Sequence, residues 1–234
     1  MNGDRRARCA IAIMAKAPRV GEAKTRLVPP LSAEDAAALS ACFIRDAAEN
    51  IAAAAREAAI DGYIAFTPQD AEAEFRPLLA ADTQLLPSCR PGLGVGLYDA
   101  AADLLAAGYG AVCLVNSDSP TLPTAILADA ARALAPPGDR LILGPAEDGG
   151  YYLIGLKQAH RDLFEGIAWS TAQVLEQTEE RARALGLAVT RMPPWYDVDD
   201  RDSLQRLQAE LRQVAGSPAI HTAAFLRRLF RDGV

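Results

Sequence analysis

Four cationic side chains follow an apolar run near the start of the chain. Residues 9–15 form a run of β-strand length, and Lys16, Arg19, Lys24 and Arg26 come soon after it. A helix-like pattern begins at residue 32, so these cations occupy a loop between a strand and a helix. Proteins of the α/β class build anion-binding sites in this position, beyond the carboxyl end of a strand. The spacing therefore predicts a site for a phosphorylated ligand, such as a nucleotide.

Turn residues shape the same basic loop. Pro18 and Gly21 interrupt it and are typical of turns. The loop is not a Walker loop, because it lacks both the Gly-Lys pair and the upstream glycine of that motif. The candidate nucleotide-binding residues of the loop are Lys16, Pro18, Gly21, Lys24, Thr25 and Arg26.

A carboxylate follows the apolar run of residues 111–116. Asp118 lies just beyond this run, and Pro120 ends it. The carboxyl end of a parallel strand is the ligand-binding rim of such a fold, and a carboxylate oxygen suits Mg²⁺. A turn or a helix N-cap would explain Asp118 equally well when it is taken alone. Beside a basic phosphate loop, we favour a metal site.

A second acidic segment lies late in the chain. Asp197 and Asp199 alternate along what we expect to be an extended segment, so they point to the same side of it. Either carboxylate could reach a metal held by Asp118, and a solvated acidic loop is the competing interpretation. Asp202 or Ser203 is explained by capping of the helix that follows.

Two glycine-rich segments offer backbone that a ligand can approach. In Asp148-Gly149-Gly150 no Cβ blocks a close approach at the glycines, and the same residues are a strong hairpin-turn signal. Gly94 and Gly96 come just before a predicted helix, with a spacing that is not the dinucleotide fingerprint. This second segment would still let a base or a ribose approach the backbone.

Bulk properties narrow the class of protein. The chain has 234 residues and a net charge of −6, which fits one domain and argues against a general nucleic-acid binder. The cysteines and histidines are scattered, so we expect free thiols and neither a zinc site nor a disulfide framework. They are Cys9, Cys42, Cys89, Cys113, His160 and His221.

The sequence also bears on location and partners. It holds no apolar run of membrane-spanning length and no signal peptide of normal form. It contains no G-x-S-x-G motif, so a serine hydrolase has little support. We expect a cytoplasmic protein, a monomer or a homodimer, that binds small molecules rather than nucleic acid or a membrane.

Strand-like and helix-like segments alternate along the chain. Strands are predicted over residues 9–15, 60–67, 83–86, 111–116, 140–143, 151–156 and 187–192. Helices are predicted over residues 33–59, 97–107, 124–134, 172–185, 203–214 and 219–231. This alternation predicts an α/β protein with a mostly parallel sheet covered on both faces. We expect the last helix to dock on the body, and contact with another subunit is the alternative.

Taken together, these motifs resemble the DUF2064 family. That family is glycosyltransferase-like and related to phospholactate guanylyltransferase. The resemblance implies the GT-A fold of nucleotide-diphospho-sugar transferases: a single domain over residues 1–234, with three α/β/α layers and a mixed, mostly parallel sheet. The matching segments are Ala15-Lys16-Ala17-Pro18, Gly21, Lys24-Thr25-Arg26-Leu27, Asn116-Ser117-Asp118-Ser119-Pro120, Gly144-Pro145-Ala146, Asp148-Gly149-Gly150-Tyr151-Tyr152-Leu153-Ile154-Gly155-Leu156 and Trp169-Ser170-Thr171.

The chain departs from the family pattern in two places. Members often carry a Gly-Asp-Leu-Gly-type segment before the middle helix, where this chain reads Gly94-Val95-Gly96-Leu97-Tyr98-Asp99. This segment resembles the Gly-Leu-Asn segment of guanylyltransferases, with Tyr98 in place of Asn. Many GT-A glycosyltransferases bind metal through Asp-x-Asp, whereas this chain has Ser117-Asp118-Ser119. A second carboxylate must therefore come from elsewhere.

The leading hypothesis is nucleotidyl transfer. A small acceptor, phosphorylated or hydroxylated, would attack the α-phosphate of a nucleoside triphosphate and release pyrophosphate. Lys24 and Arg26 would hold the β- and γ-phosphates, because an arginine fork makes paired contacts to phosphate oxygens. Asp118 would hold Mg²⁺ or Mn²⁺ together with Asp197 or Asp199. The expected acceptor-binding residues are Asp148, Gly149 and Gly150.

Two alternatives stay open. Glycosyl transfer from a nucleotide-sugar would use the same fold and metal, but a sugar donor has no third phosphate to meet the basic loop. A catalytically silent nucleotide-binding module would explain the missing Asp-x-Asp motif.

Overall fold

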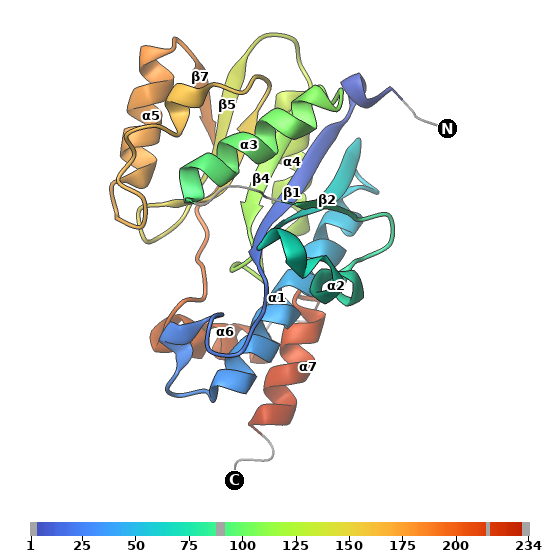
Figure 1. Cartoon of the computed structure of the whole chain (residues 1–234), viewed down its shortest axis with the longest axis vertical. Coiled ribbons are helices and arrows are strands. Elements are labelled where there is room, and N and C mark those ends of the chain that lie inside the picture. Colours follow the sequence, from blue (N-terminus) through green and yellow to red (C-terminus); the bar gives the residue numbers. More distant parts are fainter. Residues whose placement is uncertain (1–3, 88–91, 214–215, 231–234) are drawn as a thin grey trace.

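A seven-stranded sheet forms the centre of the molecule (Figure 1). The computed structural model describes residues 4–87, 92–213 and 216–230, so Cys89 and the last residues of the predicted helices 203–214 and 219–231 lie outside the described part. The strand order is β3-β2-β1-β4-β6-β5-β7. The strands are β1 Cys9–Lys16, β2 Ile60–Thr67, β3 Gln84–Pro87, β4 Ala111–Asn116, β5 Arg140–Pro145, β6 Tyr151–Leu156 and β7 Ala188–Arg191.

Strand β6 is antiparallel to both of its neighbours, and every other pair in the sheet is parallel. Strands β1 and β4 pair directly, with Met14 opposite Asn116, so their carboxyl ends meet at one edge of the sheet. The turn from β5 into β6 lies at the same edge, because β5 runs in the direction of β4. The mixed, mostly parallel sheet expected from the sequence is confirmed.

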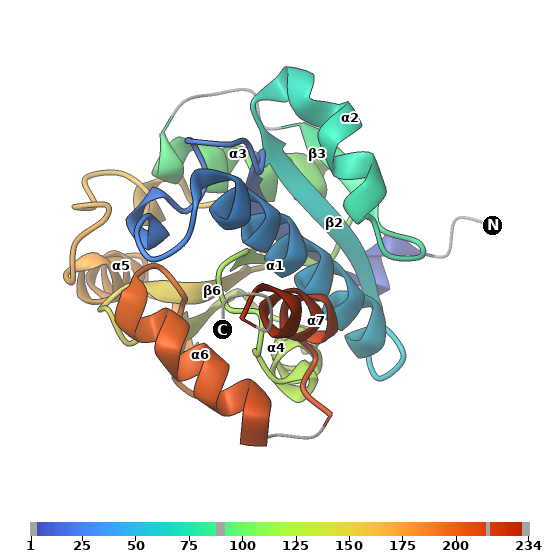
Figure 2. The ribbon, with the colours of Figure 1, turned by 90° about the horizontal axis from the view of Figure 1, so that it is seen from below.

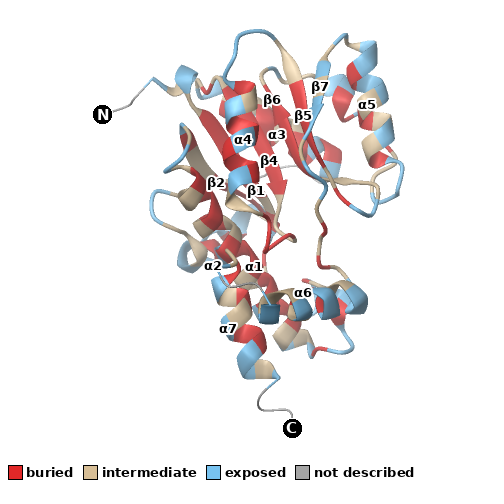
Figure 3. Ribbon diagram, turned by 180° about the vertical axis from the view of Figure 1, so that it is seen from behind, coloured by how far each residue is buried: buried red, intermediate tan, exposed pale blue. Residues whose placement is uncertain are grey.

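Helices cover both faces of this sheet and complete three layers. Helices α1 and α4 pack on one face, and α3 and α5 pack on the other. The five central strands are buried along most of their length, whereas the edge strands β3 and β7 are not (Figure 3). The helices are α1 Ala33–Ala54, α2 Glu72–Phe75, α3 Leu93–Ala106, α4 Thr124–Leu134, α5 Val174–Ala184, α6 Arg201–Gln213 and α7 Ile220–Leu229.

Strand β1 shows why the central strands read as continuous apolar runs. Its side chains alternate between the two faces, and both faces are covered. Ile11 and Ile13 lie in the core beneath α1 and α4, whereas Ala10 and Ala12 lie in the core beneath α3. All four side chains are fully buried. This strand therefore carries the basic loop on a rigid base.

Two helix boundaries and one short helix differ most from the predicted helices. Helix α3 begins at Leu93 rather than at residue 97, because glycines of low helix propensity stand inside its first turn. Helix α1 ends at Ala54 rather than at residue 59, where the chain turns back toward β2, and its alanine-rich sequence carries no stop signal. The short helix α2 was not predicted, since its four residues are too few for a periodic pattern.

A third apolar cluster lies below the sheet and joins α6 and α7 to the first half of α1 (Figure 2). Tyr196 and Val198 belong to this cluster, so the segment before α6 is anchored by buried side chains. Val198, which stands between Asp197 and Asp199 in the sequence, is completely buried. Among the described residues, no helix has both the length and the apolar character needed to cross a membrane.

Asp46 of α1 caps the start of α7. Its carboxylate oxygens accept the backbone N–H groups of His221, at 2.8 Å, and Thr222, at 2.9 Å. The Asp46 side chain is fully buried. The N–H groups in the first turn of a helix have no acceptors within that helix. Here Asp46, from another helix, supplies them, whereas a usual N-cap comes from the residue just before the helix.

We predict that Asp46→Ala lowers the free energy of unfolding by about 1–3 kcal/mol, because two buried N–H groups lose their acceptors. Urea unfolding measures this loss. Asp129→Ala is the control, because Asp129 forms an exposed ion pair with Arg132, and we expect it to change stability by less than about 0.5 kcal/mol. Equal midpoints for the two variants would contradict the capping role.

Candidate functional site

The basic loop turns sharply between β1 and α1. Gly21 has φ of +74°, a left-handed conformation that favours glycine. Lys24 also has a positive φ, of 49°, and it precedes a short 3-10 helix over Thr25–Leu27. The buried Leu27 fixes this short helix against the cluster below the sheet. The loop thereby brings Lys24 back under the carboxyl ends of β1 and β4.

Lys24 makes the central contact of the site. Its ammonium nitrogen lies 2.9 Å from Asp118 Oδ1 and 2.7 Å from Asp199 Oδ1, and it donates to the Val198 carbonyl at 2.8 Å. Only 7% of the side chain is exposed. Burial opposes its charge, but the two carboxylates outweigh this effect and raise the pKa of Lys24. The ammonium is therefore charged, with hydrogen bonds to Asp199 and to the Val198 carbonyl and an ion pair with Asp118.

The acidic segment before α6 is held close to Asp118 by its backbone. The Val198 N–H donates to the Asp118 carbonyl at 2.9 Å. Upstream, Trp195 bridges in parallel to Ala146 at the end of β5. These contacts place Asp199 and Asp118 on one ammonium, although they are far apart in the sequence.

Arg206 of α6 links the turn after β5 to the segment before α6. Its guanidinium forms two hydrogen bonds with Glu147, at 2.5 and 3.0 Å. It also lies 3.8 Å from the centre of the Tyr196 ring, a cation–π distance. The turn after β5 and the segment before α6 are thus fastened to each other.

Two adjoining pockets open at this edge of the sheet. The larger has a volume of about 580 Å³ and the smaller about 240 Å³. The smaller pocket is lined by the basic loop, including Lys16, Lys24 and Thr25. The residues that line both pockets are Arg26, Ser117, Asp118 and Asp199. Three of the four cations of the basic loop, Lys16, Lys24 and Arg26, therefore share one cleft with the predicted carboxylates.

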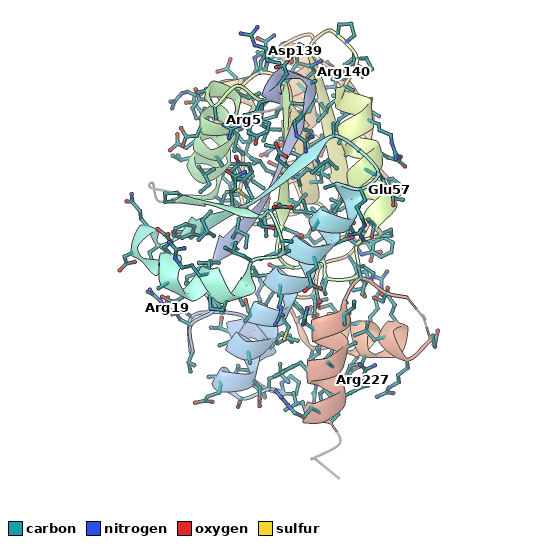
Figure 4. All side chains as sticks on the ribbon, turned by 90° about the vertical axis from the view of Figure 1, so that its right-hand side faces the viewer. Arg5, Arg19, Glu57, Asp139, Arg140 and Arg227 are labelled. Carbon is teal, nitrogen blue, oxygen red and sulfur yellow. The ribbon has the colours of Figure 1, made fainter. Side chains whose placement is uncertain are left out.

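The cations of the basic loop have different surroundings. Arg26 is exposed and has no hydrogen bond or ion pair with the described residues. Lys16 is also exposed, 3.6 Å from Glu22. Arg19 does not line either pocket: its guanidinium binds Glu74 at 2.6 Å, beside helix α2 (Figure 4). The sequence pattern grouped Arg19 with the others, but this ion pair directs it away from the cleft.

Lys24 was expected to bind phosphate, but its partners in this structure are different. In this structure its ammonium is bound to carboxylates rather than held open in the pocket. Arg26 and Lys16 are the cations of the loop that are accessible to an anionic ligand. This division could not be read from spacing, because all of them lie within one short stretch of sequence.

The larger pocket is rich in carboxylates. Asp118, Asp148, Asp197 and Asp199 all line it. Burial, together with the charges of Asp199, Asp148 and Asp118, raises the pKa of Asp197 to about 6. In the described part of the chain, no group of three or more histidines, cysteines or acidic residues is arranged to hold a metal ion.

The site nevertheless fits a divalent cation. Asp118 and Asp199 already direct oxygens at one positive charge, the Lys24 ammonium. Asp197 lies in the negative potential of its neighbours, which the pKa of its carboxyl reflects. Carboxylate oxygens are the donors that Mg²⁺ and Mn²⁺ prefer. The assignment of Asp118, Asp197 and Asp199 as metal ligands remains a prediction.

The turn after β5 was expected either to form a tight hairpin turn or to let a ligand approach its glycines. Asp148 accepts the Gly150 N–H at 2.8 Å, and Gly149 has φ of +91°. A Cβ on Gly149 would lie 2.3 Å from the Ala172 carbonyl oxygen. The Gly149 backbone thus needs glycine for the fold itself. Asp148 and Gly150 line the larger pocket, and their role toward an acceptor stays a prediction.

An aromatic wall of the larger pocket was not identified as part of the site from the sequence. Trp169 packs edge-on against Tyr151, with ring centres 6.4 Å apart, and both line the pocket. Gly94 lets this indole approach, since a Cβ there would lie 2.6 Å from Trp169 Nε1. Gly94 therefore shapes the pocket through Trp169, whereas direct contact of Gly94 and Gly96 with a nucleotide stays a prediction.

Comparison with known proteins gives a consistent picture. The family model described as "Uncharacterized protein conserved in bacteria (DUF2064)" matches residues 35–171. A solved structure from Desulfovibrio desulfuricans, described as a nucleotide-diphospho-sugar transferase, is 30% identical, with a TM-score of 0.84 and 95% of each chain covered. None of the curated proteins matches the sequence.

Two more distant structures share the fold. The 4-diphosphocytidyl-2C-methyl-D-erythritol synthase from Anaerococcus prevotii has a TM-score of 0.57 at 9% identity, covering 91% of this chain and 100% of that chain. The glucosyl-3-phosphoglycerate synthase from Mycobacterium tuberculosis, complexed with Mn²⁺, UDP and phosphoglyceric acid, has a TM-score of 0.51 at 13% identity. It matches over 89% of this chain and 76% of that chain. At these identities the similarity shows the fold alone.

We predict that Gly94→Ala displaces Trp169, although glycine-to-alanine changes inside helices usually stabilise by up to about 1 kcal/mol. The added Cβ overlaps the indole, so we expect a loss of stability and a shift of tryptophan emission. A Trp195→Phe background isolates the Trp169 signal. Val95→Ala, at an exposed position of the same turn, is the control. Higher stability with unchanged emission would show that the indole does not depend on Gly94.

Proposed function

The chain belongs to the DUF2064 family and has the fold of nucleotide-diphospho-sugar transferases, and from its cleft we propose that it is a nucleotidyltransferase. It moves a nucleoside monophosphate from a nucleoside triphosphate to a small acceptor. An acceptor oxygen forms a bond to the α-phosphorus, the bond from that phosphorus to the bridging oxygen breaks, and pyrophosphate leaves. The acceptor proton passes to solvent or to a carboxylate of the pocket.

The observation that carries this proposal is the meeting of two unlike pockets: in the smaller one three cations offset three carboxylates, whereas the larger one has four carboxylates and a single cation. The smaller pocket offers Lys16, Thr25 and Arg26, which suit the β- and γ-phosphates and the departing pyrophosphate. The larger pocket has room for a nucleoside and an acceptor. The α-phosphate would lie where the pockets join, beside Arg26 and Asp118.

Arg26 has the central role in this arrangement. It lines both pockets and has no ion-pair partner among the described residues, so its guanidinium is available to phosphate oxygens. Phosphoryl transfer needs positioning and charge neutralisation more than a covalent partner. The Arg26 guanidinium at the junction would neutralise phosphate charge and, once bound to the phosphate oxygens, position them.

Asp118, Asp197 and Asp199 would hold Mg²⁺ or Mn²⁺. When bound, such an ion neutralises phosphate charge and orients the phosphate chain. The chain's own residues keep these carboxylates in place: the Val198 backbone holds Asp118, and the buried Val198 side chain anchors the segment that carries Asp197 and Asp199. Asp148 and Gly150, at the rim of the larger pocket, would contact the acceptor.

Glycosyl transfer from a nucleotide-sugar is the alternative. It is favoured by the likeness to the Desulfovibrio protein described as a nucleotide-diphospho-sugar transferase. In that reaction the nucleoside diphosphate leaves, and the smaller pocket would have no third phosphate to bind. The released product therefore distinguishes the two reactions.

We predict that Arg26→Ala lowers triphosphate turnover by roughly 10²–10³-fold, because one charged contact to the reacting phosphates is lost. Arg19→Ala is the matched control, since this second arginine of the loop is paired with Glu74 outside the cleft. Circular dichroism would confirm that both variants fold. Retained turnover in Arg26→Ala would contradict the role of this side chain.

The reaction itself is tested by incubating the protein with each common nucleoside triphosphate and nucleotide-sugar, a mixture of small acceptors, and Mg²⁺ or Mn²⁺. We expect pyrophosphate from one or more triphosphates. Release of a nucleoside diphosphate from a nucleotide-sugar would favour glycosyl transfer instead. Tight nucleotide binding without either product would favour a silent binding module.

A further inference from the structure

We propose that Lys24 is an internal cation that occupies the divalent-cation position of the nucleotide-free protein, so that the ion enters as a metal–polyphosphate complex rather than as the free ion. This inference deepens the proposed function and rests on it, because it concerns the same metal and phosphate site. It assigns to Lys24 a positioning and gating role that its place in a phosphate loop does not reveal.

The geometry around the Lys24 nitrogen is that of a bound cation. Three oxygens, from two carboxylates and one carbonyl, surround it at 2.7–2.9 Å. An ion that used Asp118 and Asp199 together would have to bind beside the ammonium that already holds Oδ1 of each carboxylate. Its positive charge would also repel the ammonium at short range, where little water screens them. A free divalent ion must therefore displace a charged group that is already well bound.

A polyphosphate changes this balance. Lys24 lines the smaller pocket as well as contacting the carboxylates, so its flexible stem can carry the ammonium to phosphate oxygens there. Lys24 would then exchange carboxylate acceptors for phosphate acceptors, while the accompanying metal takes the carboxylates. The ammonium and the two carboxylates would then each keep an oppositely charged partner. The metal and the phosphates are thus expected to bind together much more tightly than either binds alone.

The surroundings make Lys24 the residue suited to this exchange. Its side chain is 7% exposed, whereas that of Lys16 in the same loop is 57% exposed. Its ammonium also lies 5.5 Å from the centre of the Phe43 ring, on the side of the buried cluster. The position of this ammonium is therefore set by the fold, and it stays at the carboxylates until another acceptor replaces them.

Equilibrium dialysis with Mn²⁺ and inorganic tripolyphosphate tests the proposal without turnover. For the unaltered chain we expect weak retention of Mn²⁺ alone and joint retention of Mn²⁺ with tripolyphosphate. Lys24→Met should bind Mn²⁺ alone at least about tenfold more tightly, a difference of roughly 1.4 kcal/mol. Lys157→Met is the control, because this lysine contacts the Pro136 carbonyl far from the carboxylates and should leave Mn²⁺ binding unchanged.

A second measurement avoids any variant that fails to fold. The chain has three lysines, so ¹⁵N-lysine labelling gives few ammonium signals, and Lys24→Gln assigns one of them. We expect the Lys24 signal to persist with Mg²⁺ alone and to shift when Mg²⁺ and tripolyphosphate are added together.

Tight binding of Mn²⁺ alone, unchanged in Lys24→Met, together with a Lys24 signal that does not respond to Mg²⁺ and tripolyphosphate, would overturn the inference and leave the proposed function standing. Failure to retain Mn²⁺ or tripolyphosphate under any condition would overturn both.

Discussion

The contact of one buried ammonium with two carboxylates holds the site of this protein together. Lys24 comes from the loop after β1, Asp118 from the end of β4, and Asp199 from the segment before α6. A buried charge is tolerated only when it is paired and hydrogen-bonded. The fold must therefore bring these three segments to one point, and the two pockets of the cleft open on either side of it.

Each of the three segments is fixed by packing away from the site. Strands β1 and β4 are buried on both faces and pair in register, so the positions that follow them are rigid. The segment before α6 has no such strand to rest on. Instead, Val198 is buried in the cluster under α1, α6 and α7, and Arg206 ties the same segment to the turn after β5. Helices α6 and α7, which pack below the sheet, thus help to hold Asp199 in position.

The two pockets differ in charge, and this difference would orient a ligand that spans the cleft. In the smaller pocket the cations of the basic loop offset three carboxylates, whereas the larger pocket has four carboxylates, Arg26 as its single cation, and an aromatic wall. An elongated ligand with an anionic end would align with its charge toward the basic loop. The wall itself depends on Gly94, because a side chain there would fill the space of the Trp169 indole.

The sequence by itself determined the strands, the long helices and the layers, because apolar periodicity shows which faces are buried and strand ends fix where loops emerge; the four-residue helix α2 has no such periodicity. It also placed Arg26, Asp118 and the Asp197–Asp199 pair at one edge of the sheet, where their pockets open. Only the tertiary structure decided which cations are accessible: Arg19 pairs with Glu74 and Lys24 pairs with two aspartates. Lys16 and Arg26 stay exposed in the cleft. An ion pair depends on distance through space, and chain spacing does not contain that distance. The contact of Trp169 with Gly94 could not be predicted either, because these residues lie far apart in sequence and only the fold brings them together.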